Sequence, residues 1–104
     1  MIDIRTEYRK GVLFIRLIGR IDNNDYLNEI RDLINKIGIN YIVLNLENLN
    51  YISLESIDHI MKYNNEILKK KKHLLICDSN QGRGRIFEKF IPNISSELEA
   101  FSLI

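Results

Sequence analysis

The chain has 104 residues, of which 45% are hydrophobic and 28% are charged, and its formal net charge is +1. This length predicts a single domain, residues 1–104, built around one core. The composition is typical of a globular protein and excludes an extensively disordered chain. Because the net charge is close to zero, no global field draws the protein to nucleic acid or to an anionic membrane. Any partner must therefore be recognised by a local surface.

The lone cysteine, Cys77, excludes an intramolecular disulfide, and no spacing of cysteine and histidine suits a zinc site. Charges occur throughout the first eight residues, and no apolar run approaches the roughly 20 residues that span a bilayer. We therefore expect a cytoplasmic protein that does not insert into a membrane. The sequence predicts no metal and no other cofactor.

The first elements are predicted to be a hairpin and a helix. Residues 3–8 alternate in polarity, and residues 12–18, beyond a turn with glycine, are rich in β-branched and aromatic side chains. From 25 to 37 the apolar residues recur at helical spacing, with Asn23 or Asn24 as the cap and a glycine as the terminator. This pattern predicts an amphipathic helix.

Residues 41–46 are a short, mostly apolar run, which is typical of a strand covered on both faces. A second helix is predicted from Ser53, since apolar residues recur at helical spacing up to the lysines at 69–72. A basic last turn complements the negative end of the helix dipole, so we interpret these lysines as a solvated helix end. Residues 73–77 then form another buried strand.

The last part of the chain is predicted less completely. A third helix before Pro92 would offer four apolar side chains to the core: Ile86, Phe87, Phe90 and Ile91. After Pro92, residues 95–104 fit either a capped short helix or a closing strand, and we favour a strand or an irregular tail.

The predicted order is β-β-α-β-α-β-α, which indicates an α/β fold with a small, single-layer mixed sheet and helices mainly on one face. Ligands and partners of such sheets usually meet the carboxyl ends of the strands and the starts of the following helices. Residues 53–56 occupy such a place.

No group of residues indicates an enzyme. His59 and His73 accompany no nucleophile at a suggestive spacing, and we expect both to be structural or surface residues. Cys77 ends an apolar run and is predicted to be a small buried hydrophobe. The segment 81–85, Gln-Gly-Arg-Gly-Arg, matches neither common phosphate-binding motif, so we interpret it as a helix-entry loop.

Three landmarks together resemble the STAS domains of bacterial anti-sigma factor antagonists. Gly-Arg-Ile-Asp at 19–22 is similar to the family's Gly-x-Leu-Asp. Leu-Asn-Leu at 44–46, followed by Leu-Asn-Tyr-Ile at 49–52, resembles its Leu-Asp-Leu, short loop and hydrophobic pair. Arg-Ile-Phe at 85–87 resembles its basic-apolar-phenylalanine element. The resemblance covers nearly the whole chain.

This resemblance implies a regulatory domain that binds an anti-sigma factor with serine kinase activity and is released when a serine at a helix start is phosphorylated. The implied partner surface consists of six residues: Asp22, Asn24, Ser53, Leu54, Glu55 and Ser56. The last four stand where the family has Asp-Ser-Ser-Gly, and Glu55 occupies the position of the phosphoacceptor. Phosphorylation at position 55 is chemically excluded.

Several interpretations of this motif remain open. Glu55 is either a permanent, imperfect mimic of a phosphate or only an acidic first-turn residue that favours the helix dipole. Ser53 is best placed as the N-cap, and Ser56 is the alternative acceptor, about 100° further around the helix. A second functional hypothesis is an accessory STAS subunit that docks onto the ATPase of a lipid transporter without a serine switch. The sequence predicts no oligomeric state.

Overall fold

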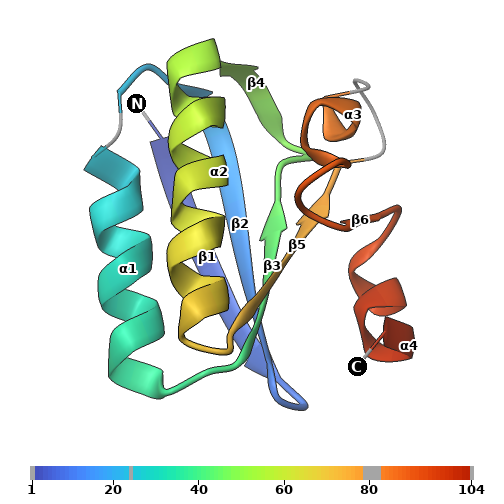
Figure 1. Cartoon of the computed structure of the whole chain (residues 1–104). Coiled ribbons are helices and arrows are strands. Elements are labelled where there is room, and N and C mark those ends of the chain that lie inside the picture. The colour runs from blue at the N-terminus through green and yellow to red at the C-terminus, as the bar shows by residue number, and fades with distance from the viewer. Residues whose placement is uncertain (1, 24, 79–82, 104) are drawn as a thin grey trace.

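The computed structural model describes residues 2–23, 25–78 and 83–103 (Figure 1). The strands of this part are β1 (Ile2–Arg9), β2 (Val12–Ile21), β3 (Tyr41–Asn45), β4 (Leu49–Ile52), β5 (His73–Cys77) and β6 (Asn93–Ile94). The helices are α1 (Asp25–Ile37), α2 (Leu54–Lys69), α3 (Gly84–Phe87), the 3-10 helix η1 (Glu97–Glu99) and α4 (Ala100–Leu103).

The strands described form one mixed sheet in the order β1-β2-β3-β5-β6, and β4 pairs with the far end of β2. β1 and β2 are antiparallel and joined by a tight turn, in which Lys10 and Gly11 both have positive φ angles. Every other pair is parallel, as connections through helices require. The predicted α/β fold with a single mixed sheet is confirmed.

The sheet is covered on both faces, and β2 shows this in its alternation. Leu13, Ile15 and Leu17 belong to the larger core, which includes the buried side chains of α1 and α2. Val12 and Phe14 point to the opposite face and belong to a smaller core that includes Ala100 of α4. The two long helices therefore share one face, while the C-terminal segment covers the other (Figure 1).

Helix α1 has the predicted bounds because its ends are encoded locally. The Asn23 side-chain oxygen accepts a hydrogen bond from the Asp25 amide at 2.9 Å. Gly38 follows the helix with φ of 65°, a conformation that glycine adopts without steric cost. The alternative cap, Asn24, lies outside the described residues.

Two expectations about the later elements were wrong. Helix α3 has only four residues, so Phe87 and Ile91 are buried, whereas Ile86 and Phe90 are 43% and 63% exposed. Residues 95–104 were expected to be a strand or an irregular tail, but after the two-residue β6 the chain forms η1 and α4, so the alternative of a short helix is the one found. Ala100 of α4 belongs to the core of the second face, where it is fully buried.

Strand β4 was not predicted, and it changes the surroundings of the helix start. β2 continues to Ile21, three residues beyond its predicted end, and its extension pairs with β4 after a register shift at Gly19.

No helix in the described part of the chain combines the length and the apolar character that crossing a membrane requires.

Candidate functional site

The start of α2 lies at the carboxyl edge of the sheet, directly after β4. Ser53 is extended, with φ of −74° and ψ of 156°, and its Oγ accepts a hydrogen bond from the Ser56 amide at 3.1 Å. The Ser53 hydroxyl also lies 3.0 Å from the Ser56 Oγ. The predicted role of Ser53 as the N-cap is therefore confirmed.

The three residues after the cap point in different directions. Leu54 is 79% exposed and Glu55 is exposed as well, whereas Ser56 is 1% exposed. Ser56 faces the buried phenol of Tyr26 on α1, whose pKa is raised by burial and partly lowered again by the Ser56 side chain. Position 55 is therefore accessible from solvent and the hydroxyl at 56 is not, so the structure gives no support to Ser56 as the alternative acceptor.

Asp22 lies beside Ser53 because β2 and β4 run parallel. Ile21 of β2 pairs with Ile52 of β4, and Asp22 and Ser53 are the residues that directly follow these two. The Asp22 carboxylate is exposed and lies 3.5 Å from the Arg20 guanidinium, which stacks at 4.6 Å over the ring of Tyr51. The structure thus brings Asp22 to the helix start, as the resemblance implies. Asn24 falls outside the described residues.

A shallow groove of about 430 Å³ runs between β4, the start of α2 and α3. Its lining includes three large apolar side chains that are unusually exposed: Tyr51 at 41%, Leu54 at 79% and Ile86 at 43%. Together with Asp22, Ser53 and Glu55, these residues define what we call the α2-start surface. Sequence reasoning missed Tyr51 and Ile86, since both were assigned to the interior or to a framework position.

The side chain of Arg83 cross-links the segments that follow β3 and β5 with the start of β4. Its Nε donates to Asp78 Oδ2 at 2.8 Å, its Nη1 to the Leu49 carbonyl at 3.0 Å and its Nη2 to the Leu46 carbonyl at 2.8 Å. The side chain of Arg83 is 13% exposed and that of Asp78 is fully buried. A charge this deeply buried needs such partners. One guanidinium therefore joins the ends of β3 and β5 to the start of β4.

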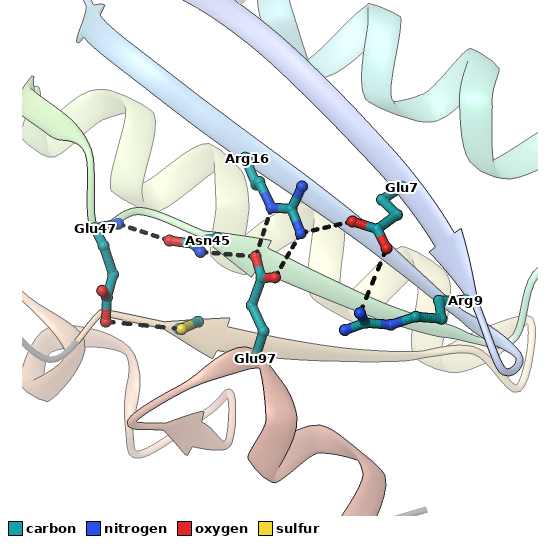
Figure 2. Close-up of polar contacts among 7 residues, drawn as sticks. Glu7, Arg9, Arg16, Asn45, Glu47 and Glu97 are labelled. Atoms are coloured by element: carbon teal, nitrogen blue, oxygen red, sulfur yellow. Dashed lines mark hydrogen bonds and ion pairs between the residues drawn. The ribbon is translucent and has the colours of Figure 1, made fainter.

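A second polar cluster lies on the sheet face under the C-terminal segment (Figure 2). Arg16 on β2 donates through Nε and Nη2 to both carboxylate oxygens of Glu97, at 2.9 and 2.7 Å, and through Nη2 to Glu7 at 2.9 Å. Asn45 on β3 donates to Glu97 at 2.8 Å. The hydrogen bond from Arg16 is the main reason that the pKa of Glu97 is lowered. This cluster fastens η1 to the sheet.

The remaining candidates have structural surroundings. His59 is half-buried on α2, and its Nδ1 lies 3.3 Å from the Glu55 carbonyl, whereas His73 is exposed and stacks on Tyr41. Cys77 is buried, as predicted, and burial together with the negative charge of Glu47 raises its pKa to about 12. Within the described residues, no group of three or more acidic, histidine or cysteine side chains is arranged to hold a metal ion.

Comparison with known proteins supports the resemblance seen in the sequence. No family model matches the chain. A curated anti-sigma F factor antagonist from Paenibacillus polymyxa is 26% identical, covering 97% of this chain and 93% of the relative. These values support the anti-sigma factor antagonist type of the STAS family.

Solved structures show the same fold. The unphosphorylated form of the anti-sigma factor antagonist SpoIIAA superimposes with a TM-score of 0.75 at 16% identity, covering 96% of each chain. An anti-sigma factor antagonist from Mycobacterium paratuberculosis gives a TM-score of 0.78 at 14% identity, covering 100% of this chain and 94% of that one. The mixed α/β sheet and its helices match these SpoIIAA-like folds.

Proposed function

We propose that this protein is a non-enzymatic regulatory module of the anti-sigma factor antagonist type. Through the α2-start surface it docks onto an anti-sigma factor with serine kinase activity, or onto a related regulator. The fold of the solved antagonists and the similarity to the curated one support this class of function. The docking residues are Asp22, Ser53, Leu54 and Glu55, with Tyr51 and Ile86 beside them.

The observation that carries the proposal is the orientation of residues 53–56. Only Leu54 and Glu55 project into solvent, while Ser53 is engaged as the cap and Ser56 is buried. The accessible position of the motif thus bears a carboxylate instead of a hydroxyl. We infer that the usual phosphorylation switch is absent here, or locked by Glu55 in one state.

The physics of the helix start explains what Glu55 can and cannot imitate. The first amides of a helix lack partners within it and lie at the positive end of the dipole, so an anion is favoured there. Glu55 supplies one negative charge, against about −1.5 to −2 for a phosphate, and a flat carboxylate instead of three phosphate oxygens. A partner that rejects a phosphate through charge repulsion is therefore repelled less strongly by Glu55.

The neighbouring apolar residues favour protein docking over binding of a small anion. Leu54, Tyr51 and Ile86 expose large side chains around the groove, and clusters of this kind mark interaction sites when polar groups surround them. Arg20 and Asp22 supply that polar rim. Leu54 also stands where the family has a small serine, so it alters the shape that a partner must match.

The decisive experiment measures binding of purified anti-sigma factor kinases to the natural protein, Glu55→Ser and Glu55→Ala. If Glu55 locks the switch, Glu55→Ser gains affinity and incorporates phosphate from ATP, and the phosphorylated form dissociates. Glu55→Ala gains affinity without incorporating phosphate. Calorimetry and radiolabel transfer measure the two effects.

The control is Leu54→Ser in the natural background, which removes the exposed leucine while Glu55 remains. Loss of binding in this variant identifies the apolar surface as the docking site. If no kinase binds the natural protein or either Glu55 variant, the antagonist function is refuted. Binding of a transporter ATPase in the same assay would instead establish the accessory-subunit function.

A further inference from the structure

A second groove lies at the opposite end of α2, away from the α2-start surface. It has a volume of about 390 Å³ and is bordered by the last turn of α2, the start of β5, the residues around Pro92 and the end of α4. Three of its lining residues are large apolar side chains with high exposure: Leu68 at 44%, Phe90 at 63% and Leu103 at 57%. Tyr41 stacked on His73 forms a further wall. We call this the β5 groove.

A strongly basic turn connects two of the residues that line the β5 groove. Leu68 and His73 both line it, and the four residues between them are all lysines. Lys72 donates to the Ile39 carbonyl, whereas Lys69, Lys70 and Lys71 are exposed. An apolar groove beside three exposed ammonium groups is complementary to a ligand that carries both apolar and acidic side chains.

The main chain of β5 also faces this groove. The His73 amide donates to Asn40 and the Cys77 carbonyl accepts from Leu46, so the odd-numbered residues of β5 bond to the β3 side. The Ile76 amide points the other way and donates to the Pro92 carbonyl. By this alternation, Leu74 also presents its amide and carbonyl to the β6 side.

Pro92 ends the pairing at this point, because proline has no N–H group to donate to the Leu74 carbonyl. Among the described residues, none forms a main-chain hydrogen bond with Leu74 on the β6 side. Leu74 also lines the groove. Leu74 is only 4% exposed, so its main-chain donor and acceptor lie at the floor of the groove, where an extended segment that enters the groove would pair with them as an added strand does.

We propose that the β5 groove docks an extended acidic segment of a partner protein that carries an aromatic or aliphatic anchor. The anchor packs between Phe90, Leu68 and Leu103. The backbone of the docked segment pairs with Leu74. The carboxylates of the segment lie near Lys69, Lys70 and Lys71. This surface is distinct from the one proposed for the kinase.

The two surfaces can be occupied together. Leu54 and Leu68 lie near opposite ends of α2, about 21 Å apart along an axis that rises about 1.5 Å per residue. A partner at the α2-start surface therefore leaves the β5 groove open. The protein can in this way hold its regulator at one end and an acidic tail at the other.

The test uses a short fluorescent peptide in which glutamate alternates with leucine and phenylalanine. We expect it to bind the full chain in an anisotropy titration and to bind more weakly as salt is raised. Matched peptides with glutamine or lysine in place of glutamate should bind at least about tenfold more weakly, since several charge pairs each contribute a small factor. Hydrogen exchange of the Leu74 amide should slow when the acidic peptide is bound.

Variants at exposed positions separate docking from folding. Phe90→Ala should weaken binding of the acidic peptide about tenfold or more, because an aromatic anchor contact is lost. The triple variant Lys69→Gln, Lys70→Gln and Lys71→Gln should weaken it similarly and remove its salt dependence. Leu98→Ala is the matched control, because Leu98 is 70% exposed and does not line the groove. Kinase binding should be unchanged in all three.

Three results would overturn the proposal. Equal binding of the acidic, neutral and basic peptides would remove the electrostatic argument. Binding to vesicles that contain phosphatidylserine, without binding to the peptide, would assign the surface to a membrane. Self-association that Phe90→Ala abolishes, again without peptide binding, would assign it to a second copy of the chain.

Discussion

The two faces of the sheet are held by different kinds of contact. Under α1 and α2, the interface is almost entirely apolar, and Ile34, Ile60 and Ile67 are all at most 1% exposed. Under η1 and α4, a smaller apolar core is supplemented by the bidentate pair of Arg16 and Glu97. Apolar packing is not screened by salt and does not titrate with pH, whereas a partly exposed ion pair is weakened by screening and by protonation. The second face is therefore the one whose cover responds to solution conditions.

The largest effect is expected on the apolar face. Ile60→Ala on α2 should lower the free energy of unfolding by about 2–5 kcal/mol, because it leaves a cavity in a fully enclosed core. Leu75→Ala on the second face should cost less, since the short α4 segment can settle into the space. Urea unfolding followed by circular dichroism measures both. Equal costs would contradict the contrast between the faces.

On the second face, Glu97→Gln should lower the free energy of unfolding by about 1–2 kcal/mol at neutral pH, as expected when a charge-assisted hydrogen bond becomes a neutral one. The pKa of Glu97 is lowered from 4.5 in the folded protein. Its contribution is therefore complete above pH 4.5 and is lost as the pH falls through the lowered pKa. Below that pH the natural protein and Glu97→Gln should converge in stability.

The reactivity of Cys77 reports whether the second face opens in Glu97→Gln. Cys77 lies in the smaller core, and burial keeps its pKa near 12, so alkylation requires this face to open. The thiol of Cys77 should be alkylated faster in Glu97→Gln than in the natural protein. In Ile30→Val, which alters the other face, the rate should be unchanged. An unchanged rate in Glu97→Gln would mean that the ion pair does not hold the C-terminal segment in place.

The smallest effect concerns the one side-chain cap of α2. Ser53→Ala removes the hydrogen bond to the Ser56 amide and should cost about 1 kcal/mol, independent of salt. Ser96→Ala is the matched control, because Ser96 precedes η1 without a capping side-chain hydrogen bond. A similar cost in thermal melts of both variants would show that the cap at Ser53 contributes nothing specific.

The apolar face could be predicted from the sequence because its signals are local. Helical spacing from 25 to 37, with Asn23 and Gly38 at its ends, gave the bounds of α1, and Ser53 gave the start of α2. Strand β4 escaped prediction because it has only four residues and Asn50 interrupts its apolar pattern. It forms only because β2 continues far enough to pair with it.

The polar contacts of the site could not be predicted in the same way, since they join distant residues. Arg83 meets carbonyls that precede it by 34 and 37 positions, and Arg16 meets Glu97 from 81 positions away. The Ser56 side chain likewise meets the phenol of Tyr26 on another helix. The resemblance implied Asp22 near the helix start, where the register of β2 and β4 also puts it, but the surface around Tyr51 and Ile86 emerged only from the fold.

The hydrogen bonds of Arg83 hold the start of α2 in place independently of the exposed residues there, so those residues can be exchanged. The three acceptors of Arg83 are two main-chain carbonyls and the buried Asp78, and none belongs to the exposed residues of the motif. Glu55 can therefore be exchanged for serine without loss of any contact that holds the edge together, while Leu54 stays in the docking surface. A phosphoacceptor could thus be introduced into this scaffold by one substitution at an exposed position.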